Sequence, residues 1–300
     1  MLSKSYSKWQ HAVIEKEVEK MFRGFYTVAS GMLAQQRKTE MLSNNMANAN
    51  TPGFKADQSS MRAFPEMLLQ RLDSAEVPTE RKLNIPFNSE IGALNTGVYM
   101  QEATPNFLQG DLKETGNGTD VALTNLSMPV DEVSGALGSI FFTIEGLDGT
   151  PRYTRNGNFT VDGSGFLTTA NGQYVLDNSD ERIQLPSDQF TINEDGQVLV
   201  NDRNVATLGI GFAGNPNTLV KQGDGLFVSE NNNPLPSAYN IEGVSFRTSQ
   251  GFLERSNVDA ARTMTDMMTA YRAFEANQKV LQAYDRSMEK AANEIGRVNG

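Results

Sequence analysis

The stretch SNVDAARTMTDMMTAYRAFEANQKVLQAYDRSMEKAANEIGR, residues 256–297, decides the fold class. Its apolar side chains recur at alternating steps of three and four residues, which predicts one long helix with a heptad seam. Ser256 is the expected N-cap, and Asp259 follows at the positive end of the helix dipole. The predicted seam comprises Met264, Met267, Tyr271, Phe274, Leu281, Met288 and Ile295, with Gln278, Asp285 and Ala292 at the remaining positions.

The distribution of glycine separates this helix from the residues before it. No glycine or proline lies between Gly251 and Gly296, whereas residues 92–251 contain 21 of the 26 glycines. Methionine is absent between Met128 and Met264. These patterns predict helical ends and a turn-rich β structure in the middle of the chain.

A second helix is expected near the N-terminus, within residues 21–53. It should end before Thr51-Pro52-Gly53, because proline disfavours helix in the preceding residue and glycine permits a turn. Two long terminal helices invite pairing, so the expected fold class is α+β, with the helices paired as a coiled coil and a central antiparallel β domain. Packing of the helices only on each other and packing on other chains both remain open at this point. The N-terminal stripe comprises Phe22, Phe25, Met32, Leu42 and Met46.

Dipeptides with turn-forming chemistry divide the middle of the chain into hairpins. Residues 116–250 are expected to form the β domain, whereas residues 54–115 are expected to be an irregular linker or arm, with a short helix near Pro65. The turns are predicted at Asn156-Gly157, Asp162-Gly163, Asn171-Gly172 and Asp195-Gly196.

The composition excludes several kinds of chemistry. The chain has 300 residues with no cysteine, one histidine (His11) and one tryptophan (Trp9), so disulfides, thiolate zinc sites and multi-histidine metal sites are excluded. The net charge of −10 argues against nucleic-acid binding, which needs basic patches. Residues 1–20 lack the apolar run of a cleaved signal peptide, and we interpret them either as a solvated N-terminal extension or as the product of an early start codon. No run is long enough for membrane insertion.

Motifs that could hold a cofactor or catalyse a reaction have simpler structural interpretations. Asp162–Gly165 lacks the acids of a calcium loop, and Gly209–Gly214 lacks the strand and helix of a dinucleotide site. The acidic pairs Asp131/Glu132 and Asp180/Glu181 have no convergent partner and are interpreted as solvated surface. We therefore expect no cofactor, no metal and no enzymatic activity.

An asparagine cluster at the end of the N-terminal helix needs a specific reason, because asparagine is a poor residue for a helix interior. It is either an ordinary polar helix exit or a set of amides that fix how this helix end meets neighbouring chains. The motif comprises Asn44, Asn45, Asn48, Asn50, Thr51, Pro52, Gly53 and Phe54.

This cluster, together with the C-terminal helix, resembles the bacterial flagellar rod and hook protein family. The resemblance begins in the segments Met21–Thr27 and Ala29–Met32 and runs through the asparagine cluster. Two segments distinguish the chain from the family pattern: residues 124–137 are inserted before Gly138–Phe142, and residues 62–94 differ from the usual arm. The other matching segments are Gln109–Leu112, Thr115–Asn117, Asp120–Leu123, Tyr153–Phe159, Gly251–Val258 and Tyr271–Gln278.

The resemblance implies a structural subunit of the flagellar basal-body rod, most like a distal rod protein or a close rod paralogue. It implies that the terminal helices, residues 21–53 and 251–300, line a tube that transmits torque and that the β domain lies outside them. The implied partners are other copies of the chain, neighbouring rod and hook proteins and the flagellar type III export apparatus. A hook or proximal rod subunit is the alternative within the family, and a secreted peptidoglycan-cleaving enzyme is the alternative of another class.

Overall fold

A computed structural model describes residues 2–297 except residues 66, 78–82, 187–188 and 231–232. No side chain is described in residues 2–23, 67–94, 291–292 or 294–297. The chain divides into two units, which are described separately. Unit 1 comprises residues 1–43, 59–103 and 264–300, and unit 2 comprises residues 44–58 and 104–263.

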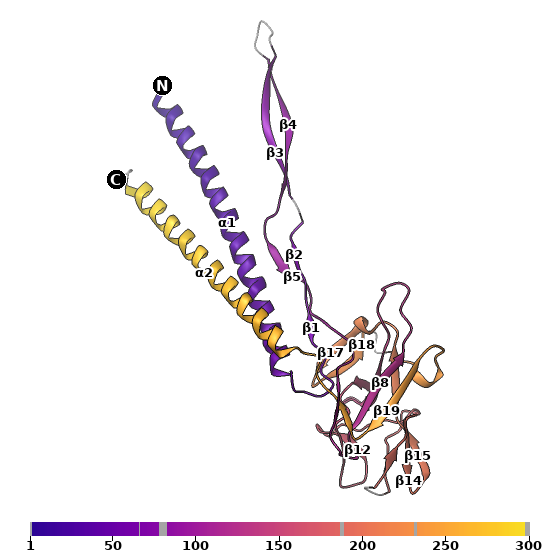
Figure 1. The fold of residues 1–300 in the computed structure, drawn as a ribbon. Coiled ribbons are helices and arrows are strands. Elements are labelled where there is room, and N and C mark those ends of the chain that lie inside the picture. The colour runs from indigo at the N-terminus through magenta and orange to yellow at the C-terminus, as the bar shows by residue number, and fades with distance from the viewer. Residues whose placement is uncertain (1, 66, 78–82, 187–188, 231–232, 298–300) are drawn as a thin grey trace. The chain divides into compact units, whose positions relative to one another are not determined.

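Unit 1 contains most of both long helices and two antiparallel ribbons (Figure 1). Thr27 Oγ1 donates to the carbonyl of Thr96, and the Val98 amide donates to Ser30 Oγ, so the first helix is tied to the loop before a short strand. In the described residues, neither helix is apolar enough over a sufficient length to cross a membrane. The elements are α1 (Leu2–Ala47), β2 (Met61–Ala63), β3 (Met67–Val77), β4 (Leu83–Leu94), β5 (Val98–Met100) and α2 (Ala260–Arg297).

The expected coiled coil is wrong. Met264 and Tyr271, two residues of the predicted seam, are 54% and 55% exposed. The described parts of α1 and α2 share no sustained run of close Cα pairs. Instead, Tyr284 and Asn277 of α2 reach over Gly24 and Gly31 of α1, where the absence of a Cβ leaves room for them.

Only half of the predicted seam is covered. Met267, Phe274, Leu281 and Met288 are partly buried, and Thr263 and Ala270, each four residues before one of them, are buried. The partly buried seam residues keep a spacing of seven, so the covered face is offset from the predicted seam and does not drift around the helix. The α+β class remains valid without the coiled coil.

The start of α2 also differs from the prediction. The helix begins at Ala260, and Asp259 Oδ1 accepts a hydrogen bond from the Arg262 amide at 3.0 Å. Asp259 is therefore the N-cap in place of Ser256.

The short helix expected near Pro65 is absent from the described residues, since β3 begins at Met67. β3 and β4 form a long antiparallel ribbon in which Met67 pairs with Leu94 and Val77 pairs with Leu83. Residues 54–115 therefore contain more regular structure than their prolines indicate.

Unit 2 is built around a five-stranded antiparallel sheet with the order β16-β9-β10-β18-β17. Every residue of β9 from Ser139 to Ile144 is buried, because both faces of the sheet are covered. Ile140, Phe142 and Ile144 point into the larger core cluster, and Phe141 points into a smaller cluster with Tyr153 and Phe227. The period of two along a strand produces this separation.

The other strands of unit 2 form small antiparallel sheets, among them β8 beside β19 in Figure 1. The strands of the two-stranded sheets that surround the exit of α1 and the start of α2 in the sequence are β1 (Asp57–Gln58), β6 (Thr104–Pro105), β7 (Leu112–Glu114), β8 (Val121–Ser127), β19 (Ser245–Gln250) and β20 (Phe252–Glu254). Those of the central sheet are β9 (Ser139–Glu145), β10 (Pro151–Thr154), β16 (Ile210–Ala213), β17 (Leu219–Gly223) and β18 (Leu226–Ser229). The remaining ones are β11 (Phe159–Val161), β12 (Leu167–Thr169), β13 (Thr191–Ile192), β14 (Gln197–Val200), β15 (Arg203–Thr207), η1 (Pro216–Thr218) and η2 (Ala238–Asn240).

Three of the four predicted hairpin turns are confirmed. β11 and β12 pair across Asp162-Gly163, β13 and β14 pair across Asp195-Gly196, and Asn171-Gly172 lies between Thr169 and Gln173, whose backbones are hydrogen-bonded. The fourth, at Asn156-Gly157, is wrong because β10 pairs with β9 and β18. At this position glycine serves close backbone packing, since a Cβ on Gly157 would overlap the carbonyl oxygen of Val121.

We predict that Gly157→Ala destabilises unit 2 by about 1–3 kcal/mol, because the backbone of β8 must move to admit the methyl group. Gly163→Ala is the matched control, since a Cβ there meets no atom within 4 Å. Its effect should stay within about 0.5 kcal/mol. Urea denaturation of the full chain measures both, and equal midpoints for the two variants would contradict the packing argument.

Candidate functional site

The asparagine motif ends α1 with a compact turn inside unit 2. The backbone amide of Asn48 donates to the backbone carbonyls of Asn44 and Asn45 at 3.1 and 3.2 Å. The side-chain Nδ2 of Asn48 donates to the Asn44 carbonyl at 2.9 Å. Thr51 Oγ1 donates to Asn48 Oδ1 at 3.2 Å. These bonds occupy carbonyls at a helix end, where intrahelical partners run out.

Asn45 joins the end of α1 to the strand that follows. Its Oδ1 accepts from the Asp57 amide at 2.9 Å, and its Nδ2 donates to the Asp57 carbonyl at 2.8 Å. Asn45 is buried, so these two bonds replace water on both ends of the amide. Lys221 Nζ lies 3.1 Å from the Asp57 carboxylate and 4.2 Å from the centre of the Phe54 ring, which secures the same corner from a third element.

Gly53 allows the chain after α1 to approach the β domain. Its φ is 68°, in the left-handed region that favours glycine, and a Cβ there would overlap the backbone of Arg155. The Gly53 amide donates to the Glu254 carbonyl at 2.8 Å. The exit loop therefore lies directly against β20 and the end of β10.

Next to this loop, three charged side chains are buried in contact with one another. Lys55, Arg155 and Glu254 are each at most 2% exposed. Lys55 Nζ lies 2.6 Å from Glu254 Oε1, and Arg155 Nη2 lies 2.7 Å from Glu254 Oε2. We call these three residues the ion cluster; it joins segments that are about 100 and 200 residues apart in the chain.

Backbone groups complete the ion cluster. Lys55 Nζ donates to the Leu108 carbonyl at 2.8 Å, and the Gly110 amide donates to Glu254 Oε1 at 2.9 Å. The Arg155 guanidinium donates to the carbonyls of Ile140 and Leu123 at 2.9 and 3.1 Å, and to Asn125 Oδ1 at 3.2 Å. A buried ion pair is stable only when its remaining donors and acceptors are satisfied in this way.

The ion cluster contains two cations and one carboxylate. Burial and the nearby Arg155 cation lower the pKa of Lys55 to about 8, although Glu254 acts in the opposite direction. Burial alone raises the pKa of Glu254, but Arg155 and Lys55 outweigh it, so the net shift is downward. Glu254 is therefore the counter-ion of both cations, and the arrangement depends on it.

Asn257 extends the cluster toward α2. Its Oδ1 accepts from the Ala56 amide at 2.7 Å, and its Nδ2 donates to the carbonyls of Asn106 and Leu108 at 2.8 and 3.0 Å. One side chain thus holds three segments together.

The structure distributes the predicted site residues unevenly. In α1, Leu42 is buried and Phe25, Met32 and Met46 are partly buried, whereas the side chain of Phe22 lies outside the described residues, as does that of Ile295 in α2. In the exit motif, Asn45, Gly53 and Phe54 are buried, Asn48, Thr51 and Pro52 are partly buried, and Asn44 and Asn50 are exposed. The amides of Asn45 and Asn48 bond within the chain.

Sequence reasoning missed the chemistry of Lys55, Arg155, Glu254 and Asn257. Each charged residue of the ion cluster directly follows apolar or strand-forming residues, as in Gly53-Phe54-Lys55 and Phe252-Leu253-Glu254. A charge that directly follows apolar or strand-forming residues is the signal that could have indicated the three charged residues.

Comparison with known proteins finds family models at three places in the chain. Residues 25–55 match the flagella basal body rod protein model, residues 137–200 match the flagellar hook protein FlgE/F/G D1 domain, and residues 249–294 match the flagellar basal body rod FlgEFG protein C-terminal model. The flagellar hook-basal body complex protein FlhO of Bacillus subtilis is 45% identical over 93% of this chain and 100% of its own length. The chain belongs to the flagellar basal-body rod and hook protein family.

Two rod proteins are among the further relatives. The flagellar basal-body rod protein FlgG of Bacillus subtilis is 31% identical over 91% of this chain and 99% of its own length. FlgG of Agrobacterium fabrum is 33% identical over 88% of this chain and 95% of its own length. The family is one of structural proteins of the flagellar basal body, and the chain is a basal-body component.

Each of the three matched segments contributes one member of the ion cluster. Lys55 is the last residue of the first segment, Arg155 lies in the second, and Glu254 lies in the third. The cluster therefore connects the three parts of the chain in which the family is recognised.

We predict that Glu254→Gln destabilises unit 2 by about 3–5 kcal/mol, because two buried cations lose their counter-ion. The exposed Glu242→Gln is the matched control and should change stability by less than about 0.5 kcal/mol. Guanidinium denaturation of the full chain compares the two. A Glu254→Gln midpoint equal to that of the wild type would show that the cluster adds no stability.

Proposed function

We propose that this chain is a rod subunit that assembles with copies of itself, and with neighbouring rod and hook proteins, through its terminal helices. The resulting axial tube transmits torque from the motor to the hook. The proposal is supported by relatives that are named as basal-body rod proteins and as a hook-basal body complex protein. Those names favour a structural role over the peptidoglycan-cleaving alternative.

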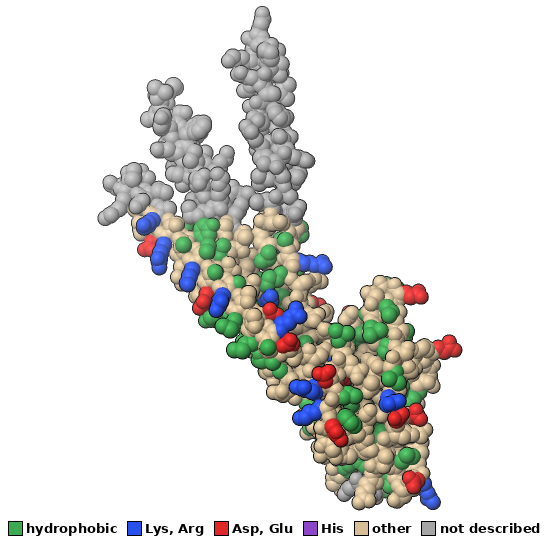
Figure 2. All heavy atoms as spheres, in the orientation of Figure 1, with side chains coloured by type: hydrophobic (Ala, Val, Ile, Leu, Met, Phe, Trp, Pro, Cys, Tyr) green, Lys and Arg blue, Asp and Glu red, His purple; other side chains and the backbone are tan. Residues whose placement is uncertain are grey.

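The observation that carries the proposal is the apolar surface left uncovered on the helices. Met264, Met268 and Tyr271 of α2 are 54%, 47% and 55% exposed, and their spacing of four and three residues puts them on one face. Tyr26 and Leu33 of α1 are also largely exposed and are seven residues apart. Figure 2 shows hydrophobic side chains between charged ones along the helices.

Such a surface fits a subunit whose neighbours complete its burial. Apolar area removed from water contributes about 25 cal/mol per Å², so covering these side chains favours association. α1 ends and α2 begins in unit 2, whose own core is closed around β9. We infer that unit 2 folds in the free chain, whereas the helices gain their final packing partners during assembly.

Passage of the chain through the flagellar type III export apparatus is part of this proposal. A narrow export channel requires a chain that can be unfolded and that refolds without disulfides, and this chain has no cysteine. The proposed helices also suit transport, because long helices without a closed core are only marginally stable before they pack.

We predict that Tyr271→Asp abolishes incorporation into the rod and motility, because it places a charge where apolar packing is needed. Ala276→Asp puts the same charge on an exposed position of another face of α2 and should leave assembly intact. Complementation of a deletion strain, read by swimming and by electron microscopy of basal bodies, compares the variants. Normal rods with Tyr271→Asp would refute assembly through this face.

A further inference from the structure

The inserted residues 124–137 comprise the end of β8 and an ordered loop with an exposed tip. Val133 is 96% exposed at the turn between β8 and β9, and the acidic residues Asp131 and Glu132 precede it. We call Asp131, Glu132 and Val133 the acidic tip. A large apolar side chain that points into solvent beside two acids has no role in the fold of its own unit.

Backbone hydrogen bonds hold the acidic tip in one conformation. The Asp131 amide donates to the Ala136 carbonyl at 2.9 Å, and the Gly135 amide donates to the Asp131 carbonyl at 2.8 Å. The Ser134 amide donates to Asp131 Oδ2 at 3.1 Å, and Val130 and Leu137 form a bridge at the base. A tip that is already ordered loses little entropy when it binds, which favours a role in recognition.

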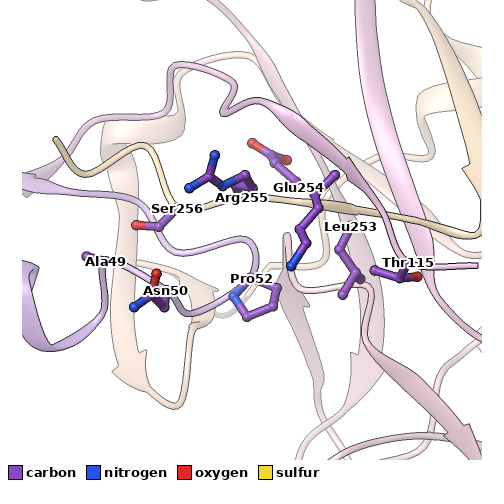
Figure 3. Close-up of a pocket in the computed structure, with 9 residues that line it drawn as sticks. Ala49, Asn50, Pro52, Thr115, Leu253, Glu254, Arg255 and Ser256 are labelled. Carbon is purple, nitrogen blue, oxygen red and sulfur yellow. The ribbon is translucent and has the colours of Figure 1, made fainter. Parts of the chain in front are cut away.

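Unit 2 also contains a cavity whose lining is chemically complementary to the acidic tip. The cavity has a volume of about 600 Å³, and Ala49, Pro52 and Leu253 form its apolar part. Lys113 and Arg255, both exposed, supply positive charge, and neither has an ion pair among the described residues. Figure 3 shows Pro52, Leu253 and Thr115 with Arg255, Asn50 and Ser256 around this space.

The positions of the two cations follow from the sheet register. Lys113 of β7 pairs with Leu253 of β20, so the cation stands beside the apolar floor of the cavity. The Arg255 amide donates to the Asp111 carbonyl at 2.8 Å, which fixes the backbone from which the guanidinium extends. Glu254, which also lines the cavity, is already paired with Lys55 and Arg155 in the ion cluster, so its charge is not available to Lys113 and Arg255.

We propose that the acidic tip of one copy docks in this cavity of a second copy, with Val133 on the apolar floor and Glu132 beside Lys113 and Arg255. The proposal rests on the proposed function, because its partner is a second copy of this chain. The contact joins two different surfaces, so it can repeat from copy to copy and build a ring or an open helical series, both of which are compatible with a tube.

A second exposed tip lacks this complementarity. Leu147, at the turn between β9 and β10, is fully exposed, but the neighbouring Asp148 is paired with Arg152 at 2.8 Å and also accepts from Thr150. Its charge is therefore already neutralised within the chain. Glu132 has no ion pair among the described residues, which selects the acidic tip as the partner of the two cations.

The absence of cysteine makes the proposal directly testable by cross-linking. Full-length Val133→Cys and Ala49→Cys chains are mixed and oxidised, and disulfide dimers are measured on a non-reducing gel, since the bond forms only when the two Cβ atoms approach within about 4.5 Å. Leu147→Cys mixed with Ala49→Cys is the matched control. The expected dimer yield is at least roughly fivefold higher than the yield of this control. That ratio corresponds to about 1 kcal/mol of binding free energy for specific pairing.

Charge reversal gives the second readout. Glu132→Lys in the Val133→Cys chain should lower the dimer yield at least about threefold, and Arg255→Glu in the Ala49→Cys partner should restore it. Glu242→Lys, at another exposed acid, should leave the yield unchanged. A yield no greater than that of the Leu147→Cys control, or equal loss with Glu242→Lys, would overturn the docking.

A dominant Val133–Val133 product between Val133→Cys chains would also overturn it, because it indicates contact between two tips. These failures are distinguishable from failure of the proposed function. If Tyr271→Asp still blocks rod assembly when the tip and cavity do not cross-link, the helices assemble the rod and only the docking is wrong.

Discussion

The packing of unit 2 depends on one buried carboxylate. Glu254 is the counter-ion of Lys55 and Arg155 at 2.6 and 2.7 Å, and its backbone carbonyl accepts from Gly53. The loop that ends α1, the end of β10 and the strand that precedes α2 therefore meet at one residue. Charges at this depth are unfavourable unless they are paired and fully hydrogen-bonded, so few other arrangements of these three segments are compatible with the sequence.

The ion cluster explains why glycines lie beside its charged residues. Gly53 and Gly110 each lie where a Cβ would overlap backbone, that of Arg155 and that of Arg255 respectively. Close approach of these backbones puts the Gly110 amide within 2.9 Å of Glu254 and the Gly53 amide within 2.8 Å of its carbonyl. Small residues therefore make the hydrogen bonds that render the buried charges tolerable. Unit 2 gains a defined structure from polar contacts as well as from its apolar core.

Much of the fold could be predicted from the sequence, since local chemistry decides it. Asp162-Gly163 and Asp195-Gly196 form turns because their residue types favour tight turns, and two long helices follow from periodicity. Periodicity does not reveal which neighbour a helix meets. It predicts Met264 and Tyr271 in a buried seam, whereas both side chains are exposed in the structure. The sequence predicts a turn at Asn156-Gly157. A glycine that leaves room for a distant segment of backbone cannot be distinguished in sequence from a glycine that forms a turn.

The site was less predictable because its partners are distant in the chain. The asparagine motif was recognised as needing an explanation, yet the partner of Asn45 is Asp57 and that of Gly53 is Glu254, which one sequence does not reveal. Lys55, Arg155 and Glu254 carry ordinary charges that composition alone assigns to the surface. Their burial is a property of the assembled sheet.

Hydrogen exchange on the free chain and on assembled rods tests the central claim, that unit 2 is complete by itself and that the helices are completed by neighbours. We expect slow exchange in β9 and β10 in both states. In residues 264–290 of α2 we expect fast exchange in the free chain and slow exchange in the rod. Slow exchange of α2 in the dilute free chain, equal to that of β9, would contradict it.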